Sequence, residues 1–153
     1  MRLSLLAIGR DRTGPESDLF NRYAARINPR LELIALADGV GSAAEIKSRE
    51  ATAILARIKP NQHVIALDSG GTAPDTLGLA AQMAQWREAG RECAFIIGGA
   101  EGLAQNVLDR ANLVLSLSKL TLPHLLARVI LAEQLYRAQS ILAGHPYHRA
   151  GRP

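Results

Sequence analysis

Short apolar runs alternate with amphipathic segments along the whole chain. Apolar runs that predict strands lie at 3–9, 31–37, 62–68, 92–99 and 112–118. Segments with apolar residues at helical spacing predict helices over 16–28, 42–58, about 75–89, about 103–110 and about 123–142. Strands that are apolar along most of their length are buried on both faces, and strands that alternate with helices are usually parallel. The pattern therefore predicts an α/β fold with a mainly parallel sheet between helices.

Local signals mark where several of these helices begin and end. Ser42 is followed three residues later by Glu45, which is a capping box. Pro29 ends the first helix, while Pro123 fits the first turn of the last one, which Gly144 closes. No internal repeat, linker or low-complexity segment interrupts the order of elements. We therefore expect a single domain over residues 1–153.

Length and composition support a folded domain. The chain has 153 residues, of which 48% are hydrophobic and 21% charged, which excludes disorder for the chain as a whole. No apolar run approaches the ~18 residues of a membrane span, and the first residues lack a small-residue cleavage site. Cys93 is the only cysteine, so an intrachain disulfide or a cysteine-based metal site is excluded. The expected location is the cytoplasm.

The surplus of positive charge lies at the carboxyl end of the chain. The formal net charge is +4, and residues 119–153 hold five of the 18 Lys and Arg residues but one of the 14 acids. Residues 1–118 are consequently balanced. A basic end on a neutral body favours an anionic partner such as RNA, DNA or a phosphorylated ligand. A merely solvated tail is the alternative.

Three polar or glycine-rich loops follow the predicted strands. They span 67–72, 98–103 and 116–124. Ligands of open α/β sheets bind at the carboxyl ends of the strands, so these loops are the candidate site. Neither a dinucleotide fingerprint nor a P-loop is present. The third loop interleaves polar residues with leucines, which suits an adenine-like ring, although Thr121 could simply cap the following helix.

The tail over 145–153 combines groups that suit contact with RNA. His145, Tyr147, His148 and Arg149 together offer stacking, hydrogen bonding and charge. His145 and His148 are three residues apart, but no third ligand is nearby, so we expect no metal site.

Four blocks of sequence together resemble one family. They are Gly98–Leu103 (GGAEGL), Leu115–His124 (LSLSKLTLPH), Arg128 to Ala138, and His145–Arg149 (HPYHR). Their order and spacing resemble the bacterial ribosomal large-subunit RNA pseudouridine N3-methyltransferases of the SPOUT class. The resemblance extends over the whole chain and is strongest after residue 95.

The resemblance implies a SPOUT-type α/β/α sandwich with a deep trefoil knot over about 95–143, followed by a tail over 144–153. It also implies a homodimer that binds S-adenosylmethionine in the knot loops. The implied cofactor contacts are Leu67, Gly98, Gly99, Leu117, Ser118, Lys119, Leu120, Thr121 and Leu122. Apolar residues on more than one side of the last helix also favour a partner subunit.

The implied reaction transfers a methyl group from S-adenosylmethionine to N3 of a pseudouridine in 23S rRNA. The N3 proton must leave, which requires a base or a cation that stabilises the anion. The candidate catalytic residues are Tyr147, His148, Arg137 and His124, and the tail residues among them can serve the partner's cofactor. The candidate RNA contacts are Arg128, His145 and Arg149.

Simpler interpretations of two of these residues stay open. Arg137 lies four residues after Glu133, the spacing of a helical salt bridge, and His124 fits a packing role at a helix start. Two other classes of protein also remain. A non-catalytic RNA-binding module of the ribosome needs the basic end but no cofactor loops, whereas a flavodoxin-like nucleotide-binding protein needs the loops but not the basic end.

Overall fold

The computed structural model describes residues 1–149, so the last four residues of the predicted tail lie outside the described residues. All ten predicted elements are present. They are β1 (Leu3–Ile8), α1 (Pro15–Arg26), β2 (Glu32–Leu36), α2 (Ala43–Leu55), β3 (His63–Thr72), α3 (Thr76–Glu88), β4 (Cys93–Ile97), α4 (Gln105–Arg110), β5 (Leu113–Leu115) and α5 (His124–Leu142). None of the helices within residues 1–149 is long and apolar enough to cross a membrane.

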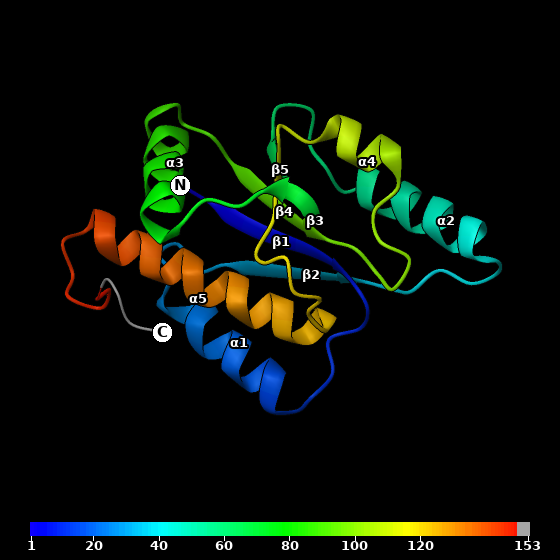
Figure 1. Ribbon diagram of the computed structural model, residues 1–153, viewed down its shortest axis with the longest axis horizontal. Coiled ribbons are helices and arrows are strands. Elements are labelled where there is room, and N and C mark those ends of the chain that lie inside the picture. The colour runs from blue at the N-terminus through cyan, green and yellow to red at the C-terminus, as the bar shows by residue number, and fades with distance from the viewer. Residues whose placement is uncertain (150–153) are drawn as a thin grey trace.

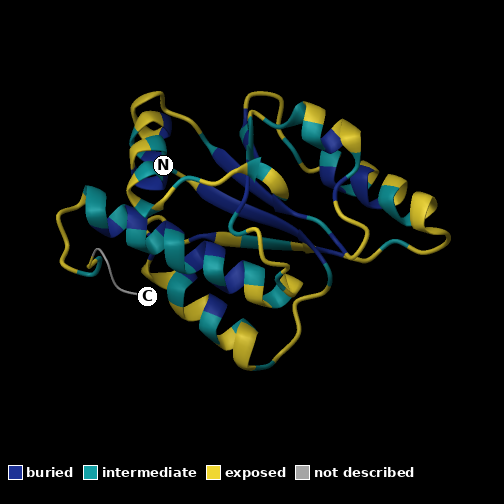
Figure 2. Cartoon of the chain, viewed as in Figure 1, coloured by how far each residue is buried: buried dark blue, intermediate teal, exposed yellow. Residues whose placement is uncertain are grey.

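The five strands form one parallel sheet in the order β2-β1-β4-β3-β5. Helices α1, α3 and α5 lie on one face and α2 and α4 on the other, as Figure 1 shows. Alternate residues of each strand enter the two cores: Leu5 and Phe95 join the first, and Ile8 and Ile96 the second. The central strands are buried throughout (Figure 2). The predicted α/β/α sandwich is confirmed.

The helix-end signals are largely confirmed. The Ser42 hydroxyl accepts a hydrogen bond from the Glu45 amide at 3.2 Å, and the Glu45 carboxylate accepts from the Ser42 amide at 3.3 Å. Gly144 follows α5 with a φ of 72°, as a glycine stop requires. The start of α5 differs from the prediction, because Pro123 is the capping residue and no side chain caps this end. The alternative role of Thr121 as a helix cap is therefore wrong.

Helix α5 lies between α1 and α3 on the sheet, which revises one argument from the sequence. Its apolar residues face several directions because the sheet and both flanking helices belong to the same chain; Val129, Leu131 and Leu135 are all buried there. Leu126 is 41% exposed. Contacts within one chain thus cover most of the apolar surface of α5. Only Leu126, at the amino end of this helix, is left exposed in a way that suggests a partner subunit.

The end of β3 runs beside the end of β5. Leu115 pairs with both Leu67 and Thr72, so residues 68–71 bulge out of β3 between the two pairings. This second pairing makes β3 longer than predicted, and β5 ends at Leu115 instead of 118. Gly71 permits the close approach: a Cβ on it would lie 2.5 Å from the carbonyl oxygen of Val114.

We expect Gly71→Ala to separate the two segments and lower the free energy of unfolding by about 1–3 kcal/mol, as overpacking commonly does. Gly70→Ala is the matched control, since a Cβ there would meet a movable carboxylate oxygen of Asp68 at 3.0 Å. Urea denaturation of both variants measures the difference. Equal stability of the two would contradict the close approach at Gly71.

Candidate active site

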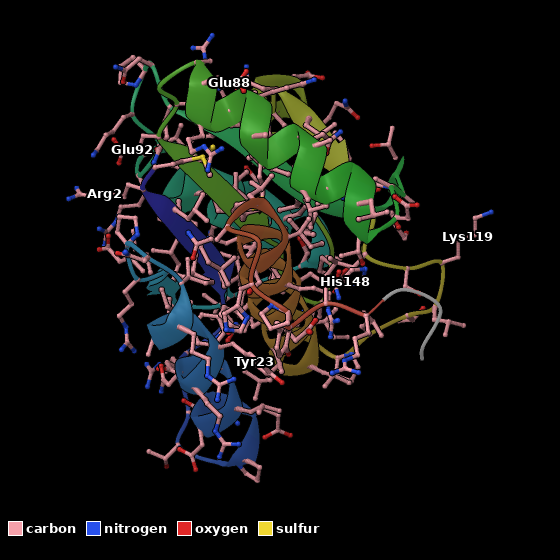
Figure 3. All side chains as sticks on the ribbon, turned by 90° about the vertical axis from the view of Figure 1, so that its left-hand side faces the viewer. Arg2, Tyr23, Glu88, Glu92, Lys119 and His148 are labelled. Atoms are coloured by element: carbon pink, nitrogen blue, oxygen red, sulfur yellow. The ribbon has the colours of Figure 1, made fainter. Side chains whose placement is uncertain are left out.

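The three predicted loops converge on one cleft at the carboxyl ends of β3, β4 and β5. Its volume is about 220 Å³. The predicted residues that line it are Leu67, Gly98, Gly99, Leu117, Ser118, Leu120, Thr121, Leu122 and His124. Lys119 is the exception among the predicted cofactor residues, because it is exposed and its side chain points away from the molecule in Figure 3. The loops meet because parallel strands share one carboxyl edge.

Two serines fix the shape of the loop after β5. The buried Ser116 hydroxyl donates to the Ser118 carbonyl at 3.1 Å, and the Ser118 hydroxyl accepts from the Leu120 amide at 2.9 Å. These bonds turn the backbone so that Leu117, Leu120 and other apolar side chains line the cleft. Apolar walls beside main-chain polar groups are a suitable environment for a heteroaromatic ring.

The glycines after β4 line the cleft and also meet other parts of the protein closely. A Cβ on Gly98 would lie 2.9 Å from Leu103, and a Cβ on Gly99 would lie 2.8 Å from the Glu50 carboxylate. Close packing inside the protein therefore requires these glycines. Glu50, which the sequence did not single out, is 4% exposed and accepts from the Gly39 amide at 2.9 Å.

A second cluster of polar groups lies on the carboxyl half of α5. The Arg137 Nε and Nη2 atoms donate to the Glu133 carboxylate at 2.9 and 2.6 Å, which confirms the helical salt bridge. The Tyr147 hydroxyl donates to the same oxygen at 3.1 Å, and Arg137 Nη1 lies 3.3 Å from His148 Nδ1. Three predicted catalytic residues thus meet, and we call them with Glu133 the α5 cluster.

The described part of the tail packs on α5. The Arg137 guanidinium carbon lies over the Tyr147 ring, 4.7 Å from the ring centroid. The Tyr147 and Tyr136 rings meet edge-on, with their centroids 4.7 Å apart. Figure 3 shows His148 beside the end of the helix. Tyr147 and His148 are only partly exposed, so this part of the tail is not merely solvated.

Hydrogen bonding and burial raise the pKa values of two groups in the α5 cluster. The hydrogen bond to Glu133 raises the pKa of Arg137. Burial, followed by hydrogen bonds to Tyr23 and Glu133, raises the pKa of Tyr147 above its usual range. Tyr147 therefore stays protonated at neutral pH. In this arrangement its hydroxyl is a hydrogen-bond donor and not a proton acceptor.

The α5 cluster and the cleft are separated within one chain. His124 lines the cleft and Arg137 lies 13 residues further along the same straight helix. At 1.5 Å per residue this places them ~20 Å apart along the axis. One substrate atom cannot contact both sites of a single chain at once.

The remaining predicted residues lie in three different environments. His124 is exposed at the cleft, so its alternative role in packing is wrong. His145 and Arg149 are exposed near the end of the described chain, and His145 Nδ1 accepts from the Tyr147 amide at 3.2 Å. Arg128 is buried, and its Nη2 donates to the carbonyls of Ile8 and Gly9 at 3.1 and 2.8 Å.

Solved structures identify the class of this fold. A probable methylase family protein from Haemophilus influenzae Rd KW20 superposes with a TM-score of 0.54 at 15% identity, covering 93% of this chain and 66% of the other. At that identity the likeness shows the fold alone. This chain thus shares the arrangement of its sheet and helices with that protein.

Sequence comparison then identifies the family. The family model described as predicted SPOUT methyltransferase matches residues 1–148, and the chain belongs to this family. This membership decides against both a non-catalytic RNA-binding module and a flavodoxin-like protein.

Individual relatives match over nearly their full length. A ribosomal RNA large subunit methyltransferase H from Acidiphilium cryptum (strain JF-5) is 66% identical, over 99% of this chain and 96% of the relative. The protein of the same name from Gluconacetobacter diazotrophicus is 50% identical, with 99% of each chain covered.

The raised pKa of Tyr147 predicts a measurable titration. At about pH 11, above the ordinary tyrosine value of ~10, the Tyr147 phenol should remain protonated. Glu133→Gln should bring this ionisation to lower pH, because it removes a neighbouring negative charge and leaves a weaker, neutral acceptor for the Tyr147 hydroxyl. Ultraviolet titration against Tyr147→Phe isolates the signal. If Tyr147 ionised at its ordinary pKa in the unaltered chain, the described contact with Glu133 would be wrong.

Proposed function

We propose that the protein transfers a methyl group from S-adenosylmethionine to N3 of a pseudouridine in the 23S rRNA of the large ribosomal subunit. The observation that carries this proposal is the convergence of the three strand-end loops on one cleft. The names of the relatives support the choice of large-subunit ribosomal RNA as substrate. The cytoplasm is the location that such a substrate requires.

The cleft fits S-adenosylmethionine in the chemistry of its lining. Leu117, Leu120 and Leu122 provide apolar surface for the adenine ring, and the Ser118 and Thr121 region provides polar groups at the mouth. Asp68, which also lines the cleft, is a carboxylate suited to the cofactor's hydroxyl or ammonium groups. When bound there, the cofactor supplies an electrophilic methyl group.

A homodimer completes the site in this proposal. The α5 cluster lies ~20 Å along the helix from the cleft of its own chain, so we assign it to the cleft of the partner. Leu77 on α3 is 54% exposed and Leu126 on α5 is 41% exposed, and both are suited to burial against a second copy. Two identical composite sites follow from the two-fold symmetry of such a dimer.

Within the composite site, the groups of the α5 cluster have separate tasks. Arg137 brings a positive charge that stabilises the pseudouridine when its N3 proton leaves. His148, the imidazole of the cluster, accepts this proton at Nδ1 once the contact of that atom with Arg137 Nη1 opens. Tyr147 donates a hydrogen bond and fixes the Glu133 carboxylate. His145 and Arg149 contact the RNA backbone, and His124 lies at the cofactor side.

The chain forms one domain over 1–153 in this proposal, with a trefoil knot over about 95–143. Membership in the SPOUT methyltransferase family supports the knot.

A bulky side chain in the cleft should block the cofactor. Thr121 is exposed and lines the cleft, so Thr121→Trp should fill it without burying a polar group and should lower the affinity for S-adenosylmethionine at least tenfold. Lys119→Ala is the matched control from the same loop, and its affinity should stay within twofold of the unaltered protein. Calorimetry measures both. An equal loss in the two variants would contradict the placement of the cofactor.

Mixed dimers test whether the site is composite. Thr121→Trp disables the cleft and Arg137→Gln disables the α5 cluster, so each homodimer should lack methyl transfer to unmodified ribosomes. A purified heterodimer of the two variants has one complete composite site and should recover about half of the normal turnover. If each chain instead acted alone, the heterodimer would remain inactive.

A further inference from the structure

A second cavity, the β1 pocket, lies at the carboxyl end of β1 next to the cleft. Its volume is about 260 Å³. Arg10 and Arg12 come from the loop after β1, Asp38 follows β2, and His124 and Arg128 come from the first turns of α5. His124 lines both cavities, so the β1 pocket and the cleft are neighbours.

Arg128 forms the buried side of the β1 pocket and has no ion-pair partner within residues 1–149. Arg128 is 2% exposed, and its Nη2 donates to the carbonyls of Ile8 and Gly9. Its Nε and Nη1 are buried and have no hydrogen-bond partner within residues 1–149. No carboxylate in that part of the chain forms an ion pair with Arg128.

Such an arrangement costs free energy in the absence of a ligand. A buried charge is tolerated when its N–H groups are satisfied and an opposite charge is close. Burial lowers the pKa of Arg128, against the weaker opposing effect of Asp11 and Asp38. An anion in the β1 pocket would supply the missing opposite charge.

The rest of the pocket is also positive. Arg10 and Arg12 are exposed, and Asp38 is the single carboxylate among the lining residues that the structure describes. The amino end of α5, a helix of 19 residues, reaches the pocket with no side-chain cap, and its dipole adds positive potential there. Arg128 also holds the start of the loop that carries Arg10 and Arg12, through its bonds to Ile8 and Gly9.

We propose that the β1 pocket binds a phosphate of the RNA strand that carries the target nucleotide. Arg10 and Arg12 contact the phosphate from the surface side, and Arg128 places its buried positive charge behind it. This inference rests on the proposed function for its substrate. A nucleotide held by its phosphate at the β1 pocket lies beside the cleft, where the methyl group is transferred. Arginine suits the task because its planar fork matches phosphate oxygens.

The cofactor carboxylate is the other anion close enough to reach the pocket. Loss of a contact with the RNA phosphate and loss of a contact with the cofactor carboxylate would weaken the binding of different ligands. A phosphate contact affects binding of RNA and its dependence on salt, because each neutralised phosphate releases counterions. A carboxylate contact affects the dissociation constant of S-adenosylmethionine.

The experiment uses full-length Arg10→Gln and Arg12→Gln, whose exposed side chains can be changed without disturbing the core. Arg87→Gln is the matched control, because Arg87 is exposed near the end of α3, away from the carboxyl edge of the sheet. Affinity for unmodified large ribosomal subunits is measured over a range of salt concentrations, and affinity for S-adenosylmethionine by calorimetry.

Each pocket variant should reduce the slope of log affinity against log salt by about 1. The KM for ribosomal subunits should rise several-fold, while the affinity for S-adenosylmethionine stays within twofold. Arg87→Gln should change none of these. An unchanged salt slope, or a loss confined to S-adenosylmethionine, overturns the phosphate site. Absence of methyl transfer by the unaltered protein is a separate result that overturns the proposed function, whatever the salt slopes show.

Discussion

The close approach of β3 to the end of β5 shapes the strand-end cleft. Leu115 pairs with both Leu67 and Thr72, and this approach depends on the missing side chain of Gly71. The segment after Leu115 forms one wall of the cleft and then leads into α5, which lies between α1 and α3.

Much of the fold and the cleft could be predicted from the sequence, because both follow from regular physical patterns. Continuous apolar strands between amphipathic helices indicate a buried parallel sheet, and parallel strands bring their following loops to one edge. The side chain of Lys119 is exposed and does not line the cleft, and its predicted contact with the cofactor stays a prediction. The glycines at 98 and 99 line the cleft, but the sequence did not show that Leu103, and Glu50 from a distant segment, also leave no room for a Cβ there.

Contacts between distant segments account for the rest of what the sequence did not reveal. The sequence linked the tail to RNA and not to the last helix, whereas the Tyr147 hydroxyl donates to Glu133 on α5. Arg128 and Arg137 are nine residues apart on this helix, which is 2.5 turns, so they face different sides of it. Arg128 supports the end of β1, while Arg137 joins the α5 cluster. One helix therefore carries two arginines whose environments are unrelated, and helical spacing alone does not identify either environment.

The central claim is methylation of one nucleoside of large-subunit ribosomal RNA. The most direct test is mass analysis of nucleosides from the 23S rRNA of cells that lack the protein, compared with cells in which it is restored. The account predicts that one pseudouridine loses a single methyl group in the deletion and regains it on restoration. Identical modification of the 23S rRNA in the two kinds of cell would contradict the account.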